Sequence, residues 1–161
     1  MSIRIVEANL DLSEHREAVL AMVEAYSRDT MGSAKPLDDD VRTRLIPGLK
    51  RHPTTLIFLA FEDEQAVGVA VCFIGFSTFS AKPLINIHDC MVLPEFRGRG
   101  VGRHLLRAVE AKACELGCCK LTLEVMDNNH RALRAYEAAG FFRYSLQEDT
   151  GTAIFLSKPL D

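Results

Sequence analysis

The chain has 161 residues, a formal net charge of −3 and 48% hydrophobic residues. The slight excess of acidic residues argues against a nucleic-acid-binding surface spread over the whole protein, since such surfaces are rich in Lys and Arg. No stretch approaches the roughly 18 consecutive apolar residues of a membrane span, and Met1–Ile5 lack the apolar run of a signal peptide, so we expect one cytoplasmic domain over residues 1–161.

Hydrophobic periodicity predicts interleaved strands and helices along the chain. In the first half, the expected elements are a strand at 3–6, a helix from Asp11 to Tyr26, a helix over 37–49, and strands at 54–61 and 65–76 joined as a hairpin. Asp11 and Glu14 have the spacing of an acidic capping box. The polar segment at 29–36 reads as a flexible connection.

In the second half, the expected elements are a strand at 84–92, a glycine-rich loop, a helix over 101–116, a strand at 120–126, a helix over 129–139, and strands near 141–147 and 151–157. The order is therefore β-α-α-β-β-β-α-β-α-β-β. Helices interleaved with mostly antiparallel neighbours predict a mixed α/β fold, with a central mixed sheet of about seven strands and helices on both faces.

The most informative stretch is residues 92–102, Val-Leu-Pro-Glu-Phe-Arg-Gly-Arg-Gly-Val-Gly. Gly98, Gly100 and Gly102 leave backbone N–H groups unobstructed by any Cβ where a helix begins. Those amides and the positive end of the helix dipole form a site for an anion. The arginines around it are Arg97, Arg99, Arg103 and Arg107. We expect a diphosphate ligand, and the alternative is a basic helix start without a ligand.

The spacing matches neither the dinucleotide fingerprint nor a Walker loop, because Arg103 stands where a third glycine belongs and no Gly-Lys-Ser/Thr follows. The segment resembles the acetyl-coenzyme A pyrophosphate loop of the GCN5-related N-acetyltransferases (GNAT), Gln/Arg-x-x-Gly-x-Gly/Ala, which Arg97, Gly100 and Gly102 match. The predicted element order also resembles the GNAT fold. The residues that this resemblance assigns to the cofactor are Met91, Val92, Leu93, Arg97, Gly98, Arg99, Gly100, Val101, Gly102, Arg103, Asn129 and Tyr136.

Residues 129–141 resemble a later segment of the same family, Asn-x-x-Ala-x-x-x-Tyr-x-x-x-Gly-Phe. Asn128 or Asn129 can cap the helix, and Gly140 can end it. Tyr136 falls on the apolar face of this helix, where a tyrosine is commonly part of a core. The resemblance instead makes Tyr136 the general acid.

The resemblance implies direct transfer of an acetyl group from the thioester to a neutral amine in a ternary complex. The carbonyl oxygen then needs a hydrogen-bond donor, for which we expect the Val92 N–H, and the leaving sulfur needs a proton, for which we expect Tyr136. The general base is left open among His88, Asp89 and Glu124. Strand alternation predicts that His88 and Asp89 point to opposite faces of the sheet.

We expect the acceptor site to draw on residues 26–40 and 76–80, and the candidates are Tyr26, Phe76, Phe79 and His88. Phe76 and Phe79 either line an acceptor pocket or seal the hairpin onto the core. The acidic residues at 38–40 either steer a cationic amine or complement the dipole of the helix that begins there. The acceptor is left open between a small amine (a polyamine, an amino acid or an aminoglycoside-like compound) and a protein amine.

The five cysteines are Cys72, Cys90, Cys114, Cys118 and Cys119. They include no Cys-x-x-Cys pair, so we expect no metal site. A non-catalytic acyl-coenzyme A-binding or sensing domain is the alternative to an enzyme, although such a domain would have no use for a proton donor at Tyr136. The resemblance also suggests a homodimer.

Overall fold

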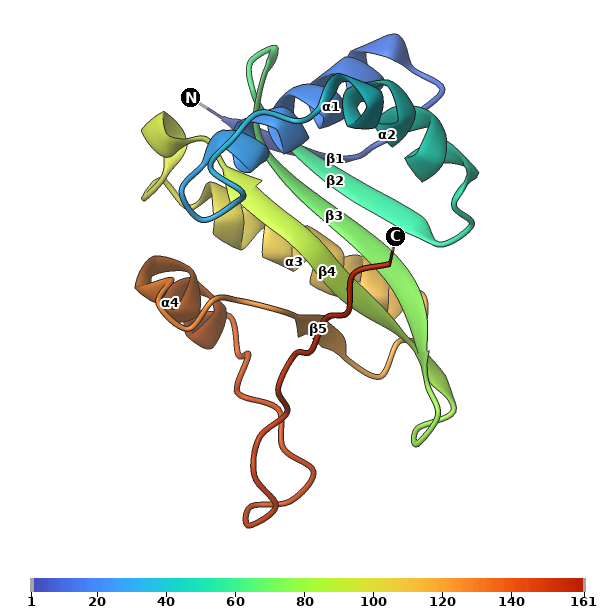
Figure 1. Cartoon of the computed structure of the whole chain (residues 1–161), viewed down its shortest axis with the longest axis vertical. Helices are drawn as coiled ribbons and strands as arrows, with labels where there is room; N and C mark the ends of the chain where they lie inside the picture. Colours follow the sequence, from blue (N-terminus) through green and yellow to red (C-terminus); the bar gives the residue numbers. More distant parts are fainter. Residues whose placement is uncertain (1, 161) are drawn as a thin grey trace. The chain divides into compact units, whose positions relative to one another are not determined.

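The computed structural model describes residues 2–160 and forms two compact units, Met1–Leu123 and Glu124–Asp161. The first unit (Figure 1) consists of β1 (Ile3–Glu7), α1 (Ser13–Arg28), α2 (Asp39–Arg51), β2 (Thr55–Glu62), β3 (Gln65–Ser77), β4 (Lys82–Val92), the 3₁₀ turn η1 (Pro94–Phe96), α3 (Val101–Glu115) and β5 (Leu121–Leu123). The second unit contains α4 (His130–Ala138). The order from β1 to α4 is the one that the sequence predicts.

The sheet has five strands in the order β1-β2-β3-β4-β5. The first four run antiparallel to their neighbours, and β5 pairs with β4 in parallel, from Ile85–Leu121 to Ile87–Leu123. The predicted strand at 120–126 is therefore shorter than expected. No helix among the described residues is long and apolar enough to cross a bilayer.

The two strands expected near 141–147 and 151–157 do not form, so the prediction of about seven strands is wrong. The chain does turn between them, since the Thr150 N–H donates to the Gln147 carbonyl (3.2 Å) and the Ala153 N–H to the Tyr144 carbonyl (3.1 Å). Within residues 124–160 there is no other strand to pair with, and an isolated two-stranded hairpin is only marginally stable in water.

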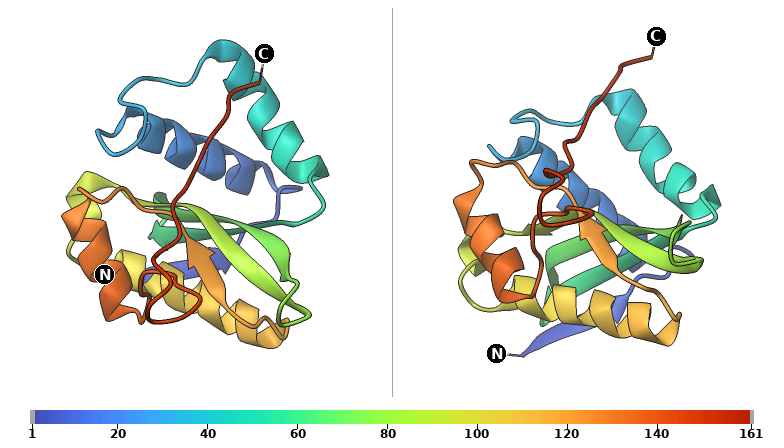
Figure 2. Two further views of the ribbon diagram at one scale, coloured as in Figure 1. Left: turned by 60° about the horizontal axis from the view of Figure 1, so that its bottom comes forward. Right: turned by 90° about the horizontal axis from the view of Figure 1, so that it is seen from below.

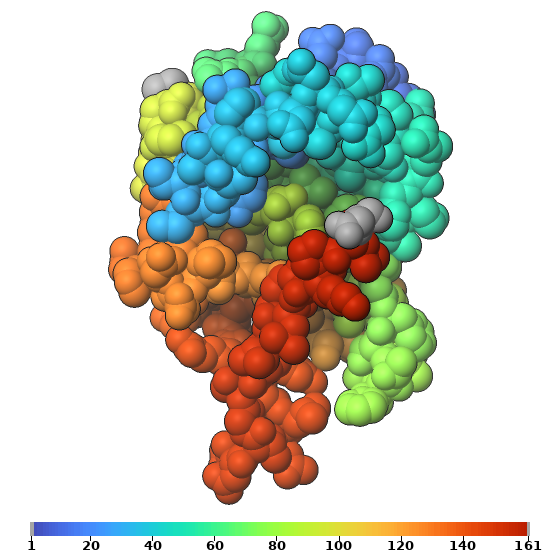
Figure 3. All heavy atoms as spheres, in the orientation of Figure 1, coloured from blue at the N-terminus to red at the C-terminus, as the bar shows by residue number. Residues whose placement is uncertain are grey.

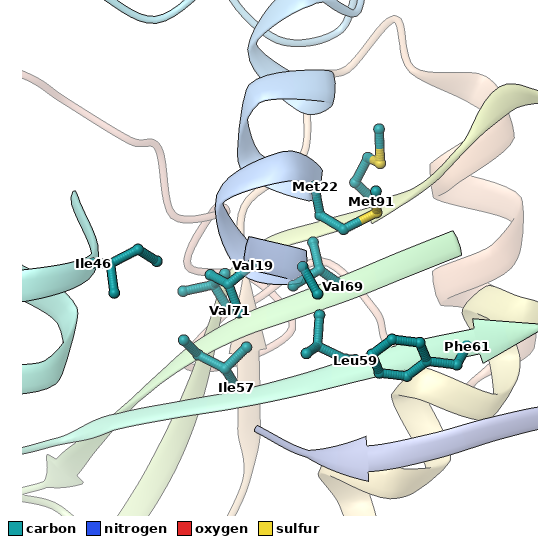
Figure 4. Close-up of a cluster of buried hydrophobic side chains, with 10 residues drawn as sticks. Val19, Met22, Ile46, Ile57, Leu59, Phe61, Val69, Val71 and Met91 are labelled. Carbon is teal, nitrogen blue, oxygen red and sulfur yellow. The ribbon is translucent and has the colours of Figure 1, made fainter. Parts of the chain in front are cut away.

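Helices cover both faces of the sheet in the first unit, with α1 and α2 on one face and α3 on the other (Figure 2). Figure 4 shows Val19 and Met22 of α1 directed onto the sheet beside Val71 and Met91. Leu59 in the same cluster is 0% exposed. Burying one such side chain contributes about 1.5–3 kcal/mol, and this packing fixes α1 over β2, β3 and β4.

On the opposite face, α3 lies close to β3 because Gly68 carries no side chain. A Cβ at Gly68 would lie 3.1 Å from Leu105 Cδ1 and 3.1 Å from the Met91 carbonyl oxygen. Leu105 is completely buried. This close packing holds α3, the helix that follows η1 and the glycine loop, against β3 and β4.

The predicted capping box at Asp11 is not formed. Helix α1 begins at Ser13, and its N-cap residue Leu12 makes no side-chain cap. The Asp11 carboxylate instead lies 2.7 Å from Lys50 Nζ at the end of α2, and its own N–H donates to Asn9 Oδ1. Asp11 therefore links the segment before α1 to the end of α2.

Candidate functional site

The glycine-rich loop ends at an uncapped helix N-terminus. Gly98 and Gly100 have φ values of 75° and 83°, which side chains with a Cβ rarely adopt, and Gly100 is the N-cap residue of α3. The first intrahelical bond runs from the His104 N–H to the Gly100 carbonyl (3.1 Å). The N–H groups of residues 101–103 therefore have no acceptor within the helix, and no described side chain caps it.

Gly102 has no packing reason to be glycine. A Cβ there would meet only Val92 Cγ2, at an ordinary 3.8 Å. Its effect is to leave the first turn of α3 accessible from outside, which suits the approach of a phosphate to the backbone amides.

Two of the four loop arginines, Arg97 and Arg99, form ion pairs with other parts of the first unit. Arg97 Nη2 donates to Asp29 Oδ2 (2.6 Å), and Arg97 Nε donates to the Val92 carbonyl (2.9 Å). Arg99 donates to the Glu62 carboxylate, and its guanidinium lies 5.1 Å from the centre of the Phe96 ring. These two arginines hold the loop to the rest of the first unit.

The other two arginines near the loop, Arg103 and Arg107, are exposed on α3 and form no ion pair with a described residue. Their charges are available to a ligand at the helix start.

A β-bulge in β4 changes the expected direction of His88. Val71 pairs with Asp89, but the next residue of β3, Cys72, pairs with Ile87, so His88 is an extra residue in β4. Asp89 shares the face of Val71, which belongs to the core beneath α1.

His88 lies on that same face, because its ring contacts the ring of Phe73 edge-on with centroids 5.5 Å apart, and Phe73 packs against the core beneath α1. The prediction that His88 and Asp89 point to opposite faces is therefore wrong. The cause is that the bulge inserts one residue and interrupts the alternation.

The environment of Asp89 is apolar enough to change its acidity. Burial raises the pKa of Asp89 above 3.8, and the electrostatic interaction with the neighbouring His88 opposes this rise. The pKa of the half-buried Tyr26 on α1 is also raised, first by burial and then by the negative charges of Asp89 and Asp29. Tyr26, Asp29, His88 and Asp89 thus gather between the end of α1 and β4.

The pairing of β4 with β5 ends next to His88 and Asp89. Their last polar cross-strand contact is the hydrogen bond from Asn86 Nδ2 to Thr122 Oγ1 (3.0 Å), and their ladder ends at Ile87 and Leu123. Strand β4 continues to Val92, and within the first unit no strand pairs with this edge beyond Ile87. An extended ligand can therefore add to the edge by main-chain hydrogen bonds.

Phe76 and Phe79 lie at the tip of the β3–β4 hairpin and are 63% and 89% exposed. Figure 3 shows this hairpin, in light green, standing out from the surface. Phe76 pairs with Pro83, which is five residues before His88, or about 16 Å along the strand. The structure does not bring these two rings to the bulge. His52, whose ring centre is 5.0 Å from that of Phe73, belongs to no sequence motif that would have identified it in advance.

The acidic residues at the start of α2 pair within their own helix. Asp39 lies 2.9 Å from Arg42, and Asp40 lies 2.5 Å from Arg44. Both carboxylates are in the first turn of α2, where they complement the helix dipole. This arrangement favours the helix-dipole interpretation for these residues.

The second unit carries the remaining candidates. Asn129 is the N-cap residue of α4, and its Oδ1 accepts from the Ala132 N–H at 3.3 Å. Tyr136 is half-buried, with its ring centre 5.9 Å from that of Phe141. Glu124 is exposed and follows the last residue of β5.

A cavity of about 610 Å³ lies between the β1–α1 connection and the end of α2. Its lining mixes polar and apolar residues and includes the ion pair of Asp11 and Lys50. Among the described residues, no group of three His, Cys, Asp or Glu side chains is arranged to hold a metal ion.

Burial raises the pKa of the Cys72 thiol to about 12, so this cysteine is not a thiolate at neutral pH.

The sequence matches the profile of the Acetyltransferase (GNAT) family over residues 19–141. It is 36% identical over 74 residues to the thialysine N-ε-acetyltransferase of Bos taurus, covering 46% of this chain and 43% of that enzyme. It is 32% identical over 103 residues to an uncharacterised N-acetyltransferase of Bacillus subtilis, covering 64% and 65%. The aligned part is therefore 43% to 65% of the length of these relatives.

A solved aminoglycoside N-acetyltransferase, AAC(6')-Iy in complex with coenzyme A, superposes with a TM-score of 0.74 over 98% of this chain and 95% of its own, at 22% identity. At that identity the likeness concerns the fold, which is the mixed α/β fold predicted from the element order. The family profile covers the glycine loop, the β4 bulge and α4 together. The chain belongs to the GNAT acetyltransferase family.

Proposed function

We propose that this protein is an N-acetyltransferase that transfers an acetyl group from acetyl-coenzyme A to a primary amine of a small molecule. The observation that carries the proposal is the open N-terminus of α3 at Gly100 and Gly102, which follows β4 through η1 and the glycine loop, together with the edge of β4 beyond Ile87, with which no strand of the first unit pairs. The names of the relatives, a thialysine and an aminoglycoside acetyltransferase, support a small amine as acceptor.

The residues present fit the co-substrate. The N–H groups of residues 101–103 would hold its pyrophosphate, with Arg103 and Arg107 adding positive charge nearby. The edge of β4 between His88 and Val92, with which no strand of the first unit pairs, would hydrogen-bond the amide groups of the pantetheine arm. Bound there, acetyl-coenzyme A supplies the acetyl group as an activated thioester.

The chain's own groups would then manage the protons and the charge. His88 or Asp89 would accept the proton of the amine, with Glu124 as the third candidate, and the burial that raises the pKa of Asp89 strengthens it as a base. The Val92 N–H would donate to the carbonyl oxygen. Tyr136 would hold the proton that the leaving sulfur requires.

The acceptor amine would enter on the face covered by α1, close to Tyr26, His88 and Asp89. The cytoplasmic location and the homodimer expected from the sequence, and a single domain over residues 1–161, remain parts of this proposal.

A thiol-release assay across a panel of polyamines, amino acids and aminoglycosides tests the function, together with calorimetry of coenzyme A binding. We expect binding of coenzyme A and thiol release with at least one small amine. Binding without release from any amine, peptides included, would favour a sensing domain. Absence of binding would overturn the proposal. In an active preparation, the pH dependence of kcat/KM in His88→Ala and Asp89→Asn identifies the base. Only the variant that lacks the base should lose the fall of kcat/KM at acidic pH.

A further inference from the structure

We propose that Asp29 is a positioning residue that joins the pyrophosphate-binding loop to the loop on the acceptor side, so that both substrates depend on it. The inference rests on the proposed function for the identity of the two substrates. It concerns a contact between residues 68 positions apart in sequence.

Asp29 follows the last residue of α1 and uses both carboxylate oxygens. Its Oδ2 accepts from Arg97 Nη2 at 2.6 Å, and its Oδ1 accepts from the Met31 N–H at 2.9 Å. Its side chain is 12% exposed, and that of Arg97 is 22% exposed. A pair this well shielded is screened by salt much less than a surface ion pair.

The segment that Asp29 begins is tightly fixed, which corrects the expectation of a flexible connection. The Asp29 carbonyl accepts from the N–H groups of Gly32 (2.9 Å) and Ala34 (3.2 Å). The Ser27 hydroxyl donates to the Lys35 carbonyl (2.6 Å). Gly32 lies so near α1 that a Cβ would be 2.1 Å from the Tyr26 carbonyl oxygen.

On the other side of the pair, Arg97 also donates to the Val92 carbonyl (2.9 Å). One guanidinium therefore holds the end of β4, the start of the glycine loop and the end of α1. Removing the charge of Asp29 leaves Arg97 without its carboxylate in a partly shielded site, which is more damaging than losing an exposed pair.

The pair formed by Arg99 and Glu62 provides a matched comparison. It also anchors the glycine loop, and the Glu62 side chain is 10% exposed. It joins the loop to β2, however, and does not involve α1 or the residues that follow it. Loss of Glu62 should disturb the cofactor side alone, whereas loss of Asp29 should disturb both sides.

The experiment compares Asp29→Asn with Glu62→Gln in the full chain. We expect both variants to raise the Kd of coenzyme A, measured by calorimetry, about tenfold, as the loss of one charge-assisted contact would. We expect only Asp29→Asn to raise the KM of the amine at saturating acetyl-coenzyme A. Without any ligand, hydrogen exchange in Asp29→Asn should accelerate both at the hydrogen-bonded amides of 32–35 and at the first bonded amide of α3, that of His104.

An unchanged coenzyme A Kd in Asp29→Asn, or equal effects of the two variants on the amine KM, would overturn the inference. So would accelerated exchange confined to one of the two loops. If Asp29→Asn does not fold, Arg97→Lys takes its place, since lysine keeps the charge but cannot contact Asp29 and Val92 together. Failure of the wild-type protein to bind coenzyme A would refute the proposed function instead, and the exchange measurement would still test the link between the loops.

Discussion

Asp89 is a side chain whose chemistry is set by its surroundings. It lies on the strand face covered by α1, beside Val71, and burial raises its pKa above 3.8. Because this pKa is higher in the folded protein than in the unfolded chain, the folded state binds the proton more tightly. Stability therefore falls as pH rises from 3.8 through the raised pKa, and it stays lower above that value.

Asp89→Asn removes this titration. The variant should therefore melt at a higher temperature than the wild type at neutral pH, and the gap should close as pH falls towards 3.8. Thermal unfolding at a series of pH values measures it. Glu64→Gln, in the exposed turn between β2 and β3, is the control and should show no such trend. A Tm difference that does not vary with pH would contradict the assignment.

Tyr136→Phe tests the proposed proton donor. The hydroxyl is lost and the ring is kept, so we expect kcat to fall about 10²- to 10⁴-fold. The Kd of coenzyme A and the Tm should change little. Tyr144→Phe makes the same chemical change elsewhere in the second unit and should leave kcat unaltered. Unchanged turnover in Tyr136→Phe would remove Tyr136 from the mechanism.

At the scale of the elements, a substitution at the start of α3 can change ligand binding without changing the packing of the helix. Gly102 is helical, and a Cβ there has only an ordinary contact with Val92 at 3.8 Å. A substitution at Gly102 therefore separates the packing of α3 from the proposed binding of the pyrophosphate at its first turn.

Gly102→Leu should leave the Tm equal to or above that of the wild type, because leucine favours helix more than glycine does. It should weaken coenzyme A binding at least about tenfold by covering the amides of the first turn. Gly102→Ala is the matched control, expected to gain about 0.5–1 kcal/mol of stability and to keep its affinity. Full affinity in Gly102→Leu would contradict the placement of the ligand.

The elements were predictable where the signal is local. Glycines at fixed spacing marked the loop, and apolar periodicity marked α1 and α3. The bulge at His88 was not predictable, because it depends on the register with β3, and neither were the partners of Arg97 and Arg99, which come from distant parts of the chain. The stretch at 141–157 has a strand-like pattern, but pattern alone supplies no neighbouring strand.

At the scale of the whole molecule, the described core of the first unit depends on the strands beneath α1. Leu59 is 0% exposed in this cluster, whereas Phe79 at the hairpin tip is 89% exposed. The protein should therefore tolerate substitution very unequally at Leu59 in β2 and at Phe79 in the turn between β3 and β4.

Leu59→Ala should lower the free energy of unfolding by about 2–5 kcal/mol, because it removes buried methyl groups and leaves a cavity. Phe79→Ala should change it by less than about 0.5 kcal/mol. Denaturant unfolding of both variants measures the difference. Similar losses in the two variants would mean that the hairpin tip is covered in solution.

The β-bulge means that one residue of β4, His88, could be deleted without reversing the faces of the other side chains. Ile87 and Asp89 already lie on opposite faces, so a three-nucleotide deletion of codon 88 would leave every other side chain of β4 on its present side. Apart from the one inserted residue, His88, β4 therefore has the alternation of a regular strand. A deletion of His88 would therefore test its proposed role as the base while keeping the apolar side chains of β4 on their present faces.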